Sequence, residues 1–147
     1  MERQQAMKKF GIPGVTVLVV DDDGASRSLL SRLLAVMGAA AVHEASSGED
    51  AIRQIFSGTR PHLIICDVGM ELIDGMAVLG ALRASTNARI AAIPFIIFTA
   101  SHDQALMTRA LQIGATGVIP KPFNPQDFSE YLFHVVNRHV TVDHTLH

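Results

Sequence analysis

Polar residues suited to phosphoryl chemistry follow four short apolar runs of this chain. They are an aspartate pair, a third aspartate, a threonine and a lysine, at Asp21, Asp22, Asp67, Thr99 and Lys121. Carboxylates held close together raise one another's pKa values unless a cation neutralises them. If the apolar runs are strands of one sheet, these residues predict a site that binds a cation together with phosphate.

The ligand types favour a hard divalent cation. The candidate ligands are carboxylate oxygens, whereas the seven histidines show no tight ligand spacing. Mg²⁺ prefers oxygen ligands, keeps several waters and accepts ligands from a phosphate. The sequence therefore predicts Mg²⁺ as the cofactor, with Mn²⁺ able to replace it.

Each of these residues has a distinct expected task in phosphoryl transfer, in which a carboxylate attacks phosphorus while cations compensate the charge on the equatorial oxygens. Asp67 is the expected phosphoacceptor. Asp21 and Asp22 would hold the metal together with Asp67. Lys121 would pair with one phosphoryl oxygen, and the Thr99 hydroxyl would donate a hydrogen bond to another.

Short apolar runs alternate along the chain with longer stretches of helical periodicity. The predicted strands are 15–20, 41–44, 63–66, 95–98 and 117–119, and the predicted helices are 25–37, 47–57, 76–83, 103–113 and 124–138. This alternation is typical of parallel strands joined by crossover helices. Because the carboxyl ends of such strands share one edge of the sheet, the five polar residues should meet there.

Several helix starts carry cap signals. The predicted N-cap residues are Asp23, Ser47 and Asn124. Pro125 suits the first position of the last helix, where its missing N–H is harmless. The dipeptide Asp74-Gly75 is interpreted as a turn without chemistry, since it marks turns widely.

Size and composition favour one cytoplasmic domain. The 147 residues suit a single core. The 12 basic and 14 acidic residues leave a net charge of −2, so the composition does not favour binding to nucleic acid or to an anionic membrane. The lone cysteine, Cys66, excludes a disulfide framework and is expected to be a small core residue. The most apolar run, 90–100, contains Pro94 and is too short to span a bilayer, so neither an anchor nor a signal peptide is predicted.

Four motifs occur in a fixed order: Val-Leu-Val-Val-Asp21-Asp22-Asp23, Asp67 with Met70 and Asp74-Gly75, Thr99-Ala100, and Lys121-Pro122-Phe123. In these motifs the chain resembles the receiver domains of two-component response regulators, including the stand-alone chemotaxis regulators. The resemblance covers residues 15–138 as the receiver domain, with 1–14 as an N-terminal extension and 139–147 as a C-terminal tail.

The resemblance implies an α/β fold, a flavodoxin-like three-layer (βα)₅ sandwich with a parallel sheet of order 2-1-3-4-5, for which a chemotaxis receiver is itself the standard example. It also implies a phosphorylated Asp67, a metal ligand from the backbone carbonyl of Gly69, and a cis peptide at Lys121-Pro122. The implied partner is a histidine kinase or a histidine phosphotransfer protein. The chain would catalyse at most its own phosphorylation and dephosphorylation.

Three residues depart from the family pattern. Glu71 stands where the family often has proline. Gly69 has no side chain to reach over the phosphoryl group, so the lifetime of the acyl phosphate is left open. Val118 replaces an aromatic residue that in many members swings inward when the equivalent of Thr99 engages phosphate. These departures concern switching and turnover rather than acceptance of phosphate.

Two alternative functions are weighed against this one. The first alternative is a haloacid-dehalogenase-type phosphatase, whose nucleophile motif matches Asp21-Asp22-Asp23-Gly24, with Asp21 attacking phosphate. Two observations argue against it: no acidic metal-binding pair follows Lys121, and Asp67 would have no role. The second alternative is a degenerate receiver that acts only as a protein-binding module, against which the intact five-residue set argues.

No output domain is predicted after residue 138, so the signal would leave through a protein surface. The usual surface in the family is formed by helix 103–113, strand 117–119 and helix 124–138. Its moderately apolar members here are Met107, Ala110, Leu111, Val118 and Tyr131. This face could bind a partner protein or a second copy of the chain.

Overall fold

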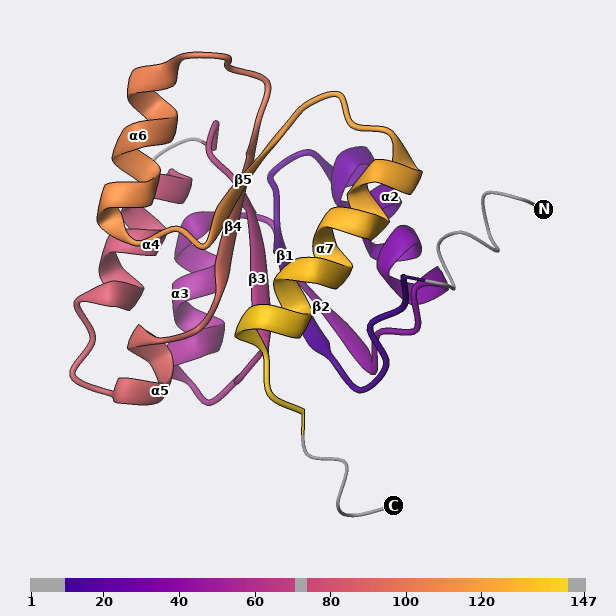
Figure 1. The fold of residues 1–147 in the computed structure, drawn as a ribbon. Coiled ribbons are helices and arrows are strands. Elements are labelled where there is room, and N and C mark those ends of the chain that lie inside the picture. The colour runs from indigo at the N-terminus through magenta and orange to yellow at the C-terminus, as the bar shows by residue number, and fades with distance from the viewer. Residues whose placement is uncertain (1–9, 71–73, 143–147) are drawn as a thin grey trace.

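The computed structural model describes residues 10–70 and 74–142, arranged around one central sheet (Figure 1). Its strands are β1 (Thr16–Val20), β2 (Ala41–Ala45), β3 (Leu63–Asp67), β4 (Phe95–Thr99) and β5 (Gly117–Pro120). Neighbouring strands pair in parallel in the order β2-β1-β3-β4-β5. The predicted order 2-1-3-4-5 is confirmed.

Helices cover both faces of this sheet. They are α2 (Gly24–Val36), α3 (Gly48–Phe56), α4 (Gly75–Arg83), α5 (Ala88–Ala91), α6 (Gln104–Ile113) and α7 (Pro125–His139). Apolar residues of α2 and α7 pack in one core cluster, and those of α3, α4 and α6 pack in the other (Figure 1). The three-layer sandwich is thus confirmed, whereas the four-residue α5 was missed because it is too short for helical periodicity.

Strand β1 shows why the sheet is covered on both sides. Val17 and Val19 belong to the cluster with α2 and α7, while Leu18 and Val20 belong to the opposite cluster, and all four are 0% exposed. Successive strand side chains point to opposite faces. A strand buried on both faces therefore needs a continuous apolar run, and that run ends where the functional residues begin.

The predicted N-caps are confirmed. Side-chain oxygens of Asp23, Ser47 and Asn124 accept backbone N–H groups at the starts of α2, α3 and α7. Asp74 was interpreted only as part of a turn, but its carboxylate accepts the N–H of Ala77 at 2.9 Å and caps α4. The turn interpretation was therefore incomplete, because the helix begins immediately after Asp74.

Residues 1–9, 71–73 and 143–147 lie outside the described part of the chain, and with them lie Glu71 and the two histidines of the extreme C-terminus. The boundaries of the N-terminal extension and the C-terminal tail stay predictions. Within residues 10–70 and 74–142, no helix is both long enough and apolar enough to cross a membrane.

Candidate functional site

Three carboxylates gather at the carboxyl ends of β1 and β3. The two strands are neighbours, with Val20 paired to Cys66, so the residues that follow them lie side by side. Asp21, Asp22 and Asp67 each offer an oxygen, and these oxygens all lie within 4.8 Å of one another. The strand order thus brings Asp21 and Asp67 together although they are 46 positions apart in the sequence (67 − 21). The sequence predicts this proximity.

Asp21 is the buried member of this cluster, with 0% exposure. Its Oδ1 accepts the N–H of Asp23 at 2.9 Å, while its Oδ2 is buried and has no hydrogen-bond partner among the described residues. Burial raises the pKa of Asp21, and the charge of Asp67 adds to that rise. A buried carboxylate oxygen without a partner is costly unless something neutralises it, so this donor set fits a hard cation.

Asp67 is more accessible than Asp21, since 14% of its side chain is exposed. Its Oδ1 accepts the N–H of Gly69 at 3.2 Å and lies 3.5 Å from the Nζ atom of Lys121. The same Nζ lies 4.4 Å from the centre of the Phe98 ring. The lysine ammonium is therefore held between an aromatic face and the predicted acceptor, where it can also reach an anion bound to Asp67.

Thr99 ends β4, one residue after Phe98, which pairs with Asp67 across the sheet. It is 2% exposed, and its Oγ1 accepts the N–H of Ser101 at 3.0 Å. That contact uses a lone pair and leaves the hydroxyl proton free to donate. The Thr99 carbonyl accepts the N–H of Lys121 at 2.8 Å, which ties the two residues of the β4–β5 side together.

Gly75 supports the site and was not recognised as doing so from the sequence. A Cβ atom at this position would lie 2.6 Å from the backbone carbonyl oxygen of Asp67 and 3.0 Å from the Cα of Val68. Glycine therefore allows α4 to begin directly against the segment that carries the acceptor. The Asp74-Gly75 motif was the available signal, but the sequence did not reveal which backbone it would touch.

Other sequence predictions have mixed outcomes. The peptide Lys121-Pro122 is cis, as the family resemblance implies. Among the described residues, a Cβ at Gly69 would come within 4 Å of Asp67 Oδ1 alone, at 3.9 Å, while the effect of this glycine on phosphoryl lifetime and the role of its carbonyl stay predictions. Cys66 is fully buried, and burial raises its pKa, which keeps it a neutral thiol as predicted.

The fold agrees with comparisons to known proteins. The family model for the response regulator receiver domain matches residues 17–133, and the chain belongs to this family. Aspartate phosphorylation and Mg²⁺ binding are typical of the family. The phosphatase alternative is not favoured by these matches.

The chain is similar to a probable chemotaxis protein CheY of Rhizobium etli, with 42% identity over 109 residues that cover 74% of this chain and 82% of that protein. A probable transcriptional regulator ycf27 of Porphyridium aerugineum is 31% identical, and the match covers 83% of this chain but only 48% of the regulator. The chain thus spans about half the length of that relative.

Solved structures give the same result. The chemotaxis response regulator CheY4 of Vibrio cholerae has a TM-score of 0.74 and 29% identity, over 82% of this chain and 98% of that one. The receiver domain of a signal transduction histidine kinase from Syntrophus aciditrophicus has a TM-score of 0.76 and 27% identity, over 88% of this chain and 96% of that one.

Proposed function

We propose that this chain is a phosphoacceptor switch of a two-component phosphorelay, which receives a phosphoryl group on Asp67 from a histidine kinase or a histidine phosphotransfer protein. Mg²⁺, or Mn²⁺ in its place, would be held by Asp21, Asp22, Asp67 and the backbone carbonyl of Gly69. The observation that carries the proposal is a buried Asp21 Oδ2 without a hydrogen-bond partner among the described residues, close to a partly exposed Asp67 beside Lys121. The predicted compartment remains the cytoplasm.

The chain's own residues divide the transfer between them. An oxygen of Asp67 forms the new bond to phosphorus as the bond from phosphorus to the donor histidine nitrogen breaks. Lys121, at 3.5 Å from Asp67 Oδ1, pairs with a phosphoryl oxygen, and the Thr99 hydroxyl donates to another. A bound cation would compensate negative charge on the phosphoryl oxygens. Exposure favours Asp67 over Asp21 as the nucleophile, because Asp21 is 0% exposed whereas 14% of the Asp67 side chain is exposed.

The direct test is phosphorylation of the purified chain by a small phosphodonor such as acetyl phosphate with Mg²⁺. The expected product carries one additional phosphoryl group that hydroxylamine removes, because it is an acyl phosphate. Asp67→Asn should abolish it, while the control Asp127→Asn, which changes an exposed aspartate of α7, should not. Phosphate release that persists in Asp67→Asn but disappears in Asp21→Asn would instead support the phosphatase alternative. Absence of both labelling and Mg²⁺ binding would support the degenerate receiver.

For the output surface, we propose the α6–β5–α7 face (Figure 1). Leu111 of α6 is 55% exposed, and Tyr131 of α7 lines a hollow with Val118 of β5. An exposed leucine on such a face suits association with a partner or a second copy. Sedimentation of the phosphorylated chain tests the homodimer, and self-association unchanged by Leu111→Ser would contradict it.

A further inference from the structure

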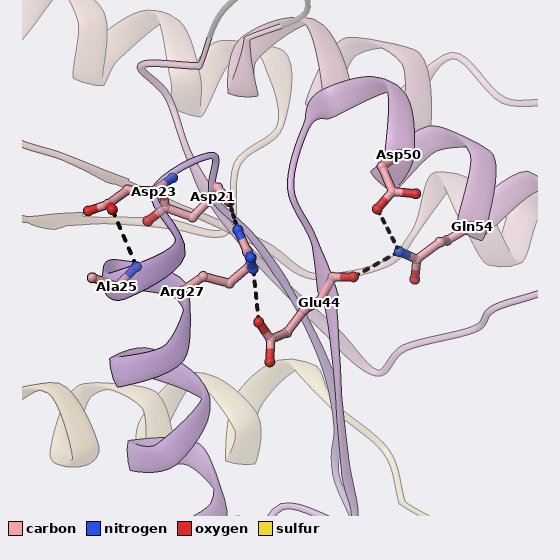
Figure 2. A network of polar contacts seen from close by, with 7 residues as sticks. All are labelled: Asp21, Asp23, Ala25, Arg27, Glu44, Asp50 and Gln54. Atoms are coloured by element: carbon pink, nitrogen blue, oxygen red, sulfur yellow. Dashed lines mark hydrogen bonds and ion pairs between the residues drawn. The ribbon is translucent and has the colours of Figure 1, made fainter.

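Figure 2 shows Arg27 of α2 between Asp21, which follows β1, and Glu44 of β2, with a contact to each. Its Nη1 donates to the backbone carbonyl of Asp21 at 2.7 Å, and its Nε donates to Oε1 of Glu44 at 2.8 Å. Only 22% of its side chain is exposed. One guanidinium thus joins the first residue after β1 to the neighbouring edge strand β2.

Glu44 is itself held from the other side. The Nε2 atom of Gln54 on α3 donates to the backbone carbonyl of Glu44 at 2.9 Å and to the Asp50 carboxylate at 3.2 Å (Figure 2). The backbone of Glu44 is therefore held by both β2 and α3, while its carboxylate, which Arg27 contacts, lies on a side chain that is 44% exposed. The planar fork of donors on Arg27 satisfies two acceptors at once, the Asp21 carbonyl and the Glu44 carboxylate.

These contacts fix both ends of Asp21. The Asp21 carboxylate is held by the N–H of Asp23 at 2.9 Å, and its peptide carbonyl is held by Arg27. The remaining carboxylate oxygen, Oδ2, is buried and has no partner among the described residues. Mg²⁺ demands near-ideal octahedral geometry, so its affinity is sensitive to small rotations of such a ligand.

We propose that Arg27, anchored by Glu44, is a positioning residue that sets the orientation of Asp21 for a divalent cation. The inference rests on the proposed metal site and adds residues to it that touch neither metal nor phosphate. Groups that orient the ligands of a metal typically change its affinity strongly when they are altered. An ion pair this exposed contributes little to stability, so its main effect should appear in metal binding.

Positioning and simple electrostatics predict opposite results for Arg27. A positive charge close to a cation site repels the cation, so removing it should strengthen binding if charge alone matters. Arg27→Gln removes the charge, and Arg27→Lys keeps the charge but cannot make the two-pronged contact. Positioning predicts weaker binding in both variants, whereas electrostatics predicts stronger binding in the first and no change in the second.

Glu44 provides a matched pair of the same kind. Glu44→Gln and Glu44→Ala lose the same charge, but only the glutamine keeps a carbonyl oxygen that can accept the Nε–H of Arg27. Positioning predicts that Glu44→Ala binds the cation more weakly than Glu44→Gln. Electrostatics predicts equal affinities for the two variants. This pair also tests the inference if the Arg27 variants fail to fold.

The experiment is titration of the metal-free full chain with Mn²⁺, followed by electron paramagnetic resonance of the free ion, with thermal melting in EDTA to verify folding. We expect Arg27→Lys to weaken binding about 10-fold. Arg32→Gln, an exposed arginine on the same helix, should leave affinity unchanged. The positioning role of Arg27 would be overturned if Arg27→Lys bound Mn²⁺ as tightly as the unaltered chain, or if the two Glu44 variants bound it equally. Either result would leave the proposed metal site in place. Failure of the unaltered chain to bind Mn²⁺ would overturn the proposed metal site as well.

Discussion

The candidate site lies at the carboxyl ends of the strands, and the two halves of this edge of the sheet are built differently. On the β1–β3 side, Asp21 is completely buried and Gly75 brings the start of α4 against the backbone of Asp67. On the β4–β5 side, the half-buried Val118 borders a hollow of about 380 Å³, which Tyr131 also lines. The first half is closely packed around carboxylates, whereas the second has room beside β5, the strand that Lys121 follows.

In the proposed phosphoacceptor switch, this difference separates the half that would accept phosphate from the half that would report it. Acceptance needs ligands held in one geometry, and close packing provides it. Readout needs an element that can adopt two arrangements, and space beside β5 permits movement there. The family resemblance implies an aromatic side chain at this place in many members, whereas this chain has Val118. We therefore expect substitutions in the first half to be costly and those in the second to be tolerated.

The largest expected effect comes from two glycine substitutions that compare the halves directly. A Cβ at Gly75 would meet backbone at 2.6 Å, whereas a Cβ at Gly117 would lie only 1.9 Å from the Tyr131 hydroxyl oxygen. Backbone cannot easily move, but the end of a tyrosine side chain can. Gly75→Ala should therefore lower the free energy of unfolding by about 2–4 kcal/mol, and Gly117→Ala by less, despite the shorter contact.

Urea denaturation followed by circular dichroism measures both values. Labelling by acetyl phosphate should fall sharply in Gly75→Ala and remain near the unaltered rate in Gly117→Ala. If Gly117→Ala proves the more destabilising of the two, the proposed contrast between the halves is wrong.

A second prediction concerns the charge of Asp21 in the metal-free protein. Burial raises its pKa in the folded state above that of the unfolded chain, so its contribution to stability is present at acidic pH and is lost as pH rises through the folded pKa. At neutral pH in EDTA, Asp21→Asn should therefore increase the free energy of unfolding, on the order of 1 kcal/mol. Thermal melts at several pH values check the direction.

Saturating Mg²⁺ should reverse this order, because a ligand that binds only the folded state stabilises it and Asp21→Asn should not bind the ion well. A variant that is less stable than the unaltered chain in EDTA would contradict the account of the buried carboxylate.

A third prediction uses the strand pair Ile97 and Val118, which face each other in the register of β4 and β5. Ile97 is 1% exposed in the core, whereas Val118 borders the hollow. Ile97→Phe should lower the free energy of unfolding by about 1–3 kcal/mol through overpacking. Val118→Phe should change it by less than about 1 kcal/mol, because the ring can enter existing space. Equal losses in the two variants, measured by urea denaturation, would remove the evidence for room beside β5.

The smallest expected effect is the reactivity of the Cys66 thiol in the native protein. The residue is buried beside Asp67, and burial raises its pKa, so the native protein should not react with a disulfide reagent such as Ellman's reagent at neutral pH. Full reaction should occur in denaturant. Rapid reaction of the native chain would mean that the β1–β3 half opens readily and is less closely packed than the second half.

Sequence patterns were sufficient to predict the strands, the long helices and the residues that gather at the carboxyl ends of the strands. Apolar runs that are buried on both faces ended at polar residues, and crossover connections fix parallel strands, so Asp21, Asp67 and Lys121 had to share an edge. The patterns failed for α5, which is too short to show periodicity, and for Asp74, whose cap function looks like a turn in sequence. Local signals of this kind are shared by several structures.

The sequence by itself determined the types of chemical groups at the site and the edge of the sheet where they meet, because both follow from the order of strands and their apolar lengths. Only the tertiary structure decided how these groups are held. The lack of a hydrogen-bond partner for Asp21 Oδ2 among the described residues, the backbone approach at Gly75 and the bridge from Arg27 to Glu44 depend on how different elements pack against one another. Asp21 follows β1 and Glu44 lies in the neighbouring strand β2, but no spacing along the sequence encodes the angle at which an arginine joins them.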